Sequence, residues 1–70
     1  INQQEYDKWL TNIEKLKDDY RTVAKMNLIE NFGYKEIADA LDMPINTVKT
    51  KIRRAKAQLL KMMDYSDELL

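Results

Sequence analysis

The sequence predicts an all-α fold of four helices, and three observations lead to that prediction. Apolar residues recur every three or four positions along most of the chain, which is the period of one face of an α-helix. The chain holds one glycine and one proline, and each falls where one periodic segment gives way to the next. Its 70 residues leave room for three or four helices. We expect one domain over residues 1–63 and an acidic tail over residues 64–70.

The first helix is expected over about residues 3–15. Charged and amide side chains alternate there with apolar ones, so the segment is amphipathic and should bury one face. Its apolar positions are Tyr6, Trp9, Leu10, Ile13 and Leu16.

The second helix is expected from about residue 17 to residue 30. Asp18 and Asp19 lie in its first turn, where the helix dipole favours anions. Its apolar residues spread over much of the circumference, which suits a central helix with neighbours on several sides. Asn31-Phe32-Gly33 then interrupts the pattern, because Asn and Gly tolerate the left-handed conformation that ends helices. Phe32 is expected to fold back on the core.

A short third helix is expected over residues 34–41, with Ile37, Ala38 and Leu41 on its inner face. Asp42-Met43-Pro44 forms the next break. An aspartate suits a turn, and a proline disfavours helix in the residue before it while fitting the first turn of the helix that follows.

The fourth helix is expected from about residue 45 to residue 63. At about 100° per residue, its apolar and polar residues separate onto two sides. The inner positions are Val48, Ile52, Ala55, Leu59 and Met62. The outer positions are Asn46, Thr50, Arg53 and Ala57, and Thr47, Lys49, Arg54 and Lys56 lie on the flanks.

The formal net charge is zero, but the charges are strongly segregated along the chain. Residues 1–42 carry six basic and nine acidic side chains, residues 43–63 carry six basic and no acidic ones, and residues 64–70 carry three acidic ones. A bland surface mixes the two signs. The uninterrupted basic segment therefore indicates contact with nucleic acid rather than an ordinary solvated face.

The composition argues against several other classes of protein. The chain has no cysteine and no histidine, so it lacks thiolate ligands, the commonest metal ligand and the commonest general base. We therefore expect no enzyme activity, no cofactor and no metal. No segment resembles a signal peptide or a membrane span, and we expect a cytoplasmic protein.

A short helix, a turn and a longer basic helix predict a helix-turn-helix, here without a wing, whose second helix lies in the DNA major groove. The candidates for base readout are Asn46, Thr50 and Arg53. The candidates for phosphate contact are Thr47, Lys49, Lys51, Arg54 and Lys56. If the four cations among them neutralise four phosphates, log affinity should fall against log salt with a slope of about −3.6.

Two segments of this pattern are similar to a known family. The residues concerned are Tyr34-Lys35-Glu36-Ile37-Ala38, then Leu41 and Pro44, and then Asn46-Thr47-Val48-Lys49-Thr50-Lys51-Ile52-Arg53-Arg54-Ala55-Lys56. They resemble region 4 of bacterial sigma-70 factors, and most closely the extracytoplasmic-function class. That class reads roughly S-Y-x-E-I-A and then L-G-I-P-x-G-T-V-K-S-R-L-x-R-A-R. Upstream, residues 16–21 and Val23 are similar to its L-P-x-x-x-R-x-V. The resemblance covers about residues 10–60.

The departures from the family pattern concern backbone and charge. Family glycines are replaced by Asn31, Asp42 and Asn46, and Asn and Asp are the residues other than glycine that best tolerate a positive φ. Asn46 adds a side chain beside the DNA. The family proline is replaced by Lys17, and Lys51 and Lys56 stand where the family has arginines. A lysine keeps the charge but lacks the bidentate geometry of arginine.

The resemblance implies a protein that binds RNA polymerase core and recognises the minus-thirty-five promoter element. It further implies contact with the flap of the polymerase beta subunit and masking by an anti-sigma factor. Four residues, Trp9, Ile13, Leu16 and Tyr20, have two interpretations: they pack in the core, or they line a groove for a polymerase helix. Arg21 and Glu36 are expected to form an ion pair between helices.

Two other functions fit parts of the sequence. The output domain of a response regulator has a similar helix-turn-helix, although the segment from residue 16 to residue 21 favours a sigma factor. A protein-interaction module that kept the fold and lost DNA binding is compatible with the zero net charge and the acidic tail.

Overall fold

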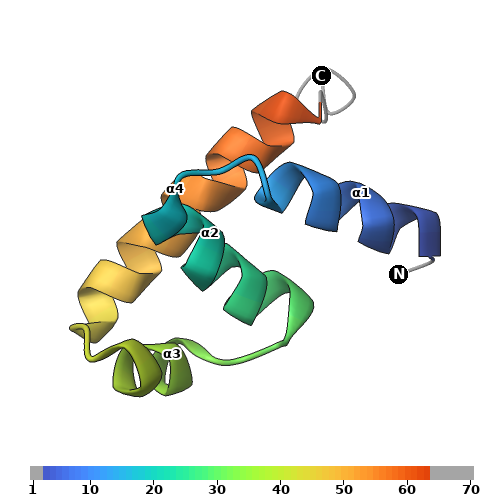
Figure 1. The fold of residues 1–70 in the computed structure, drawn as a ribbon. Helices are drawn as coiled ribbons and strands as arrows, with labels where there is room; N and C mark the ends of the chain where they lie inside the picture. Colours follow the sequence, from blue (N-terminus) through green and yellow to red (C-terminus); the bar gives the residue numbers. More distant parts are fainter. Residues whose placement is uncertain (1–2, 64–70) are drawn as a thin grey trace.

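The computed structural model describes residues 3–63, which fold into α1 (Gln3–Ile13), α2 (Asp18–Ala24), η1 (Lys25–Ile29), α3 (Tyr34–Leu41) and α4 (Ile45–Met62). No strand occurs in that range, so the predicted all-α fold is confirmed. The long helix α4 runs along one side of the molecule, with α3 near its beginning, α2 across its middle and α1 towards its end (Figure 1). The predicted acidic tail over residues 64–70 lies outside the described residues.

Helix α1 begins at residue 3, as the pattern predicts, but it ends at Ile13, two residues before the predicted end. A tight turn follows, in which Lys15 N–H donates to the Asn12 carbonyl at 3.1 Å and Leu16 N–H donates to the Ile13 carbonyl at 3.0 Å. Leu16 is nevertheless only 5% exposed, so it reaches the core from the turn rather than from the helix.

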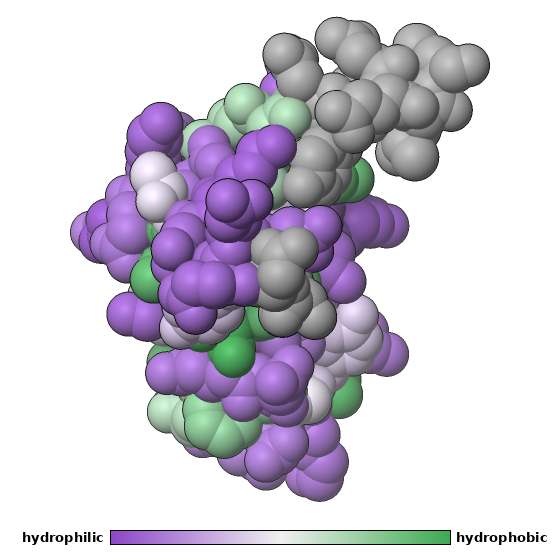
Figure 2. Space-filling view, turned by 90° about the vertical axis from the view of Figure 1, so that its right-hand side faces the viewer, coloured by the Kyte–Doolittle hydropathy of each residue, from purple (hydrophilic) through white to green (hydrophobic). Residues whose placement is uncertain are grey.

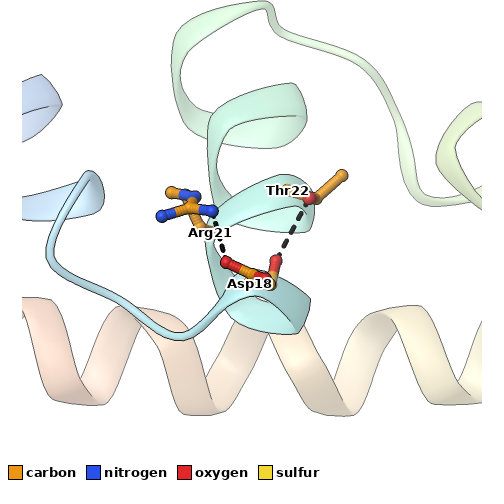
Figure 3. Close-up of polar contacts among 3 residues, drawn as sticks. All are labelled: Asp18, Arg21 and Thr22. Carbon is orange, nitrogen blue, oxygen red and sulfur yellow. Dashed lines mark hydrogen bonds and ion pairs between the residues drawn. The ribbon is translucent and has the colours of Figure 1, made fainter.

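Helix α2 begins at Asp18, and its first turn is held by local polar contacts. The Thr22 hydroxyl donates to the Asp18 carbonyl at 3.1 Å, and the Arg21 guanidinium pairs with the Asp18 carboxylate (Figure 3). The expected pair between Arg21 and Glu36 was therefore wrong, because a carboxylate one turn away on the same helix takes the guanidinium. The Glu36 carboxylate instead accepts the Gly33 N–H at 2.9 Å, at the start of α3.

The predicted second helix changes character at Lys25, where a π-helical turn, η1, replaces the α-helix. Glu30 N–H donates to the Lys25 carbonyl, five residues back, at 3.1 Å, and Phe32 N–H donates to the Met26 carbonyl at 2.9 Å. Asn31, with a φ of 61°, adopts the left-handed conformation. Phe32 is 39% exposed, so the expectation that its ring folds back on the core was wrong. Besides these backbone hydrogen bonds, the Asn27 side-chain amide donates to the Phe32 carbonyl at 2.9 Å, so the loop is held by polar contacts.

The turn between α3 and α4 is closed by backbone hydrogen bonds at both ends. Asp42 has a φ of 55°, and Met43 N–H donates to the Ala38 carbonyl at 2.9 Å, which is the six-residue closure of a Schellman motif. The Pro44 carbonyl accepts from Thr47 N–H at 3.0 Å and so begins α4. These bonds fix the angle between the two helices of the predicted helix-turn-helix.

Two groups of buried side chains hold the helices together. The first joins α2, α3 and the first half of α4 through Val23, Ile37, Ala38, Val48 and Ile52. The second joins the α1 end, α2 and the second half of α4 through Ile13, Leu16, Ala24, Ala55, Leu59 and Met63. Met62, predicted to point inward, is 41% exposed, whereas Met63 is 6% exposed. Both positions lie about equally far from the middle of the inner face, and the position of α1 favours Met63.

Candidate nucleic-acid interface

Helix α4 is two-sided in the way its spacing predicts. Its inner residues are almost completely buried, with Val48 at 0% and Ile52 at 1% exposure. On the opposite side, Asn46 and Arg53 are exposed and Thr50 is half-buried. We call Asn46, Thr50 and Arg53 the outer face of α4. The buried inner face anchors the helix, which leaves Asn46 and Arg53 exposed to solvent and Thr50 partly so.

The flanking cations of α4 differ in how they are engaged. Lys49, Arg54 and Lys56 are exposed, and none of them forms an ion pair with any residue of the range 3–63. The predicted phosphate contacts Thr47 and Lys51 are half-buried. Three cations on the flanks of the outer face are therefore uncompensated, which gives the surface the charge that a phosphate backbone requires.

Two shallow grooves run along α4, one on either side of Thr50. The α3-side groove has a volume of about 320 Å³ and is lined by Tyr34, Lys49, Thr50, Ile52, Arg53 and Lys56. The α2-side groove has a volume of about 310 Å³ and is lined by Tyr20, Asn46, Thr47, Thr50, Lys51 and Arg54. Thr50 lines both, so it lies on the ridge between them. The base-readout and phosphate candidates thus share one continuous surface.

Tyr34 also lines the α3-side groove, although the sequence pattern did not indicate it as a site residue. Tyr34, the first residue of α3, is 39% exposed, and its ring centroid lies 6.0 Å from Lys49 Nζ. An aromatic face attracts a cation at this distance. Nothing in the chain spacing points to this contact, since it depends on the angle that the Asp42 turn sets between α3 and α4.

The four partner-binding candidates divide into two pairs. Ile13 and Leu16 are buried at 0% and 5% exposure, so they belong to the core and offer no surface in this structure. Trp9 and Tyr20 are half-buried and pack against the same group of residues. Packing in the core therefore accounts for Ile13 and Leu16. For Trp9 and Tyr20 it accounts only for the buried part of each side chain.

A separate apolar groove lies between α1 and η1, and we call it the α1 groove. It has a volume of about 250 Å³ and is lined by Tyr6, Trp9, Leu28, Ile29 and Asn31. No residue of α4 lines it. Figure 2 views the molecule from the side on which α1 lies in Figure 1, and hydrophobic residues reach that face in small areas between hydrophilic ones. The α1 groove is therefore an apolar hollow separate from the surface of α4 that carries the cations.

The described residues offer few other kinds of site. Residues 3–63 contain no group of three or more Asp or Glu side chains placed to hold a metal ion. None of the helices in that range is both long and apolar enough to cross a membrane.

Comparisons with known proteins identify the family of this chain. The family model described as "Sigma-70, region 4" matches residues 7–59. The ECF RNA polymerase sigma factor SigW of Bacillus subtilis is 41% identical over 51 residues, which is 73% of this chain and 27% of that protein. The ECF RNA polymerase sigma-E factor of Haemophilus influenzae is 32% identical over 47 residues, covering 67% of this chain and 25% of that protein. The chain thus spans about a quarter of the length of these relatives. No solved structure matches it significantly.

Proposed function

The chain belongs to the sigma-70 region 4 family, and from this premise we propose that it binds the minus-thirty-five promoter element by placing α4 in the major groove. In this proposal Asn46, Thr50 and Arg53 contact base edges, because short polar and guanidinium side chains can pair with them. Lys49, Arg54 and Lys56 contact the phosphates that border the groove. Tyr34 supports Lys49 from the other helix of the motif.

One observation supports this proposal more than any other. Exposed Asn46 and Arg53 lie on the side of α4 opposite a completely buried inner face, and exposed cations without ion-pair partners in residues 3–63 flank them. A helix with only a structural role has no need of uncompensated cations along both flanks.

A salt titration tests the electrostatic part of this proposal. If Lys49, Arg54 and Lys56 neutralise three phosphates, log affinity for any duplex should fall against log salt with a slope of about −2.7. The slope is measured by fluorescence anisotropy on a labelled duplex between low and physiological salt. A slope near zero would contradict DNA binding through this face.

We further propose that the α1 groove receives part of RNA polymerase, the flap of the beta subunit. Both relatives are named as RNA polymerase sigma factors. An apolar hollow with aromatic walls suits an apolar side chain of a partner. Because α4 contributes nothing to its lining, α4 remains available for DNA while the α1 groove is occupied.

Replacing Tyr6 by alanine is expected to weaken binding to the polymerase flap about tenfold, because an exposed aromatic wall of the groove is lost. The measurement is the dissociation constant between the chain and purified beta flap. Tyr34→Ala is the matched control, since Tyr34 is 39% exposed and Tyr6 36%, but Tyr34 lines the α3-side groove. Equal losses in the two variants would contradict docking at the α1 groove.

A further inference from the structure

Lys51 differs from the other cations of α4 in being held by α2. Its Nζ lies 3.3 Å from Asp19 Oδ2 and 5.8 Å from the centroid of the Tyr20 ring. The Lys51 side chain is 21% exposed, whereas Asp19 is 76% exposed. The lysine therefore points away from the outer face of α4, lies along Tyr20 and ends at a carboxylate on the neighbouring helix.

The position of Lys51 on α4 explains why it can turn this way. At about 100° per residue, it lies roughly 130° around the helix from the middle of the outer face, whereas Lys49, Arg54 and Lys56 lie roughly 70° to 90° away. A lysine stem so far round the helix runs beside α2. Asp19 and Tyr20, in the first turn of α2, then meet its charge and its methylene groups.

We propose that Asp19 is a positioning residue that holds Lys51 against α2 and keeps it out of the set of phosphate contacts. This inference rests on the proposed DNA binding by α4. A phosphate contact strengthens binding to every sequence alike, whereas contacts to base edges discriminate between sequences. By retaining one cation, Asp19 lowers the sequence-independent affinity and leaves the outer face of α4 a larger share of the binding energy.

Asp18 supplies a matched control for Asp19. The two carboxylates are adjacent in the first turn of α2, so their removal changes the net charge equally and at nearly the same place. Asp18, however, pairs with Arg21. Arg21 lines a hollow with Glu14, Thr22, Lys25 and Met26, and none of these belongs to α4. Removing the Asp18 charge therefore tests simple repulsion from DNA without releasing Lys51.

The experiment measures the affinity of the 70-residue chain for a labelled random-sequence duplex over a range of salt concentrations. Asp19→Asn should steepen the slope by about 0.9 and raise affinity about fivefold at 0.1 M salt, because Lys51 gains a phosphate. Asp18→Asn should change affinity less than twofold and leave the slope unchanged. Asp19→Glu, which keeps the carboxylate, should behave as the parent chain does. In a Lys51→Gln background, Asp19→Asn should leave the slope unaltered.

Each contrary outcome has a distinct meaning. Equal gains for Asp19→Asn and Asp18→Asn, or a gain that persists in the Lys51→Gln background, would overturn the role of Asp19 while leaving DNA binding by α4 intact. A parent chain that binds no duplex at low salt would instead overturn the proposed function, and this inference with it. Far-UV circular dichroism on every variant checks that each remains folded, as substitutions at exposed Asp18 and Asp19 should permit.

Discussion

Replacing Ile52 by alanine is expected to unfold a large fraction of the protein at room temperature. Ile52 is 1% exposed and belongs to the buried group that joins α2, α3 and α4. Truncation of a buried isoleucine to alanine costs about 2–5 kcal/mol of unfolding free energy. A domain of this size has only about 3–5 kcal/mol to lose. The substitution therefore removes most of the margin that holds α4 in place.

Ile45→Ala provides the matched control for this prediction. Ile45 is the first residue of the same helix and is 40% exposed, so its truncation should cost less than about 1 kcal/mol. Urea denaturation followed by far-UV circular dichroism gives the unfolding free energy of both variants. Similar losses at the two positions would mean that α4 lacks a distinct inner face, and the assignment of its outer face to DNA would lose its basis.

The bounds of α3 and the beginning of α4 could be predicted from local sequence. Helix α3 has the predicted bounds, and α4 begins at the predicted residue. Asn31 and Asp42, which stand where the family has glycines, are the two non-glycine residues with positive φ in the range 3–63. Lys17, which stands where the family has a proline, has a φ of −61°, the value that a proline would impose. At these places the backbone conformation follows from short-range sterics.

Some features that the sequence did not reveal depend on contacts between distant residues. Leu28 and Ile29 lie in the π-helical turn η1 and line a groove with Tyr6 and Trp9 of α1, and a regular period of 3.6 residues does not predict such a turn. The side chains of Asp19 and Lys51 meet across 32 positions of sequence. The helical period already places Lys51 further round α4 than the other phosphate candidates, but only the packing of α2 beside α4 shows which carboxylate it meets.

The surface charge of the candidate site depends on the basic run in the sequence and on the acidic side chains of other helices. The basic run of residues 43–63 is visible in the sequence, and the helical period distributes it around α4. Which cations remain available is decided by the acidic side chains of the earlier helices. Asp19 reaches α4, whereas Asp18 pairs with Arg21 and Asp39 pairs with Lys35 inside α3. The charges of Asp18 and Asp39 are thus paired within their own helices, away from the cations of α4.

Replacing Arg53 by alanine is expected to reduce discrimination between a preferred duplex and a random one by about 1–3 kcal/mol, or roughly five- to 150-fold. Arg53 is exposed on the outer face of α4, and a guanidinium can pair with a guanine edge through two hydrogen bonds at once. In a first step, the parent chain selects its preferred sequence from a randomised pool of duplexes. The affinities of both variants for the selected and random duplexes are then compared at one salt concentration.

Lys56→Ala is the contrast that gives this result its meaning. Lys56 lines the same α3-side groove as Arg53, three residues further along α4, and it too is exposed. If Lys56 contacts a phosphate, Lys56→Ala should weaken binding to both duplexes alike and make the salt slope shallower by about 0.9. If Arg53→Ala also weakened both duplexes equally, Arg53 would be a backbone contact, and base readout would have to come from Asn46 and Thr50. A shift in the selected sequence with Arg53→Ala would instead identify the base pair that the guanidinium reads.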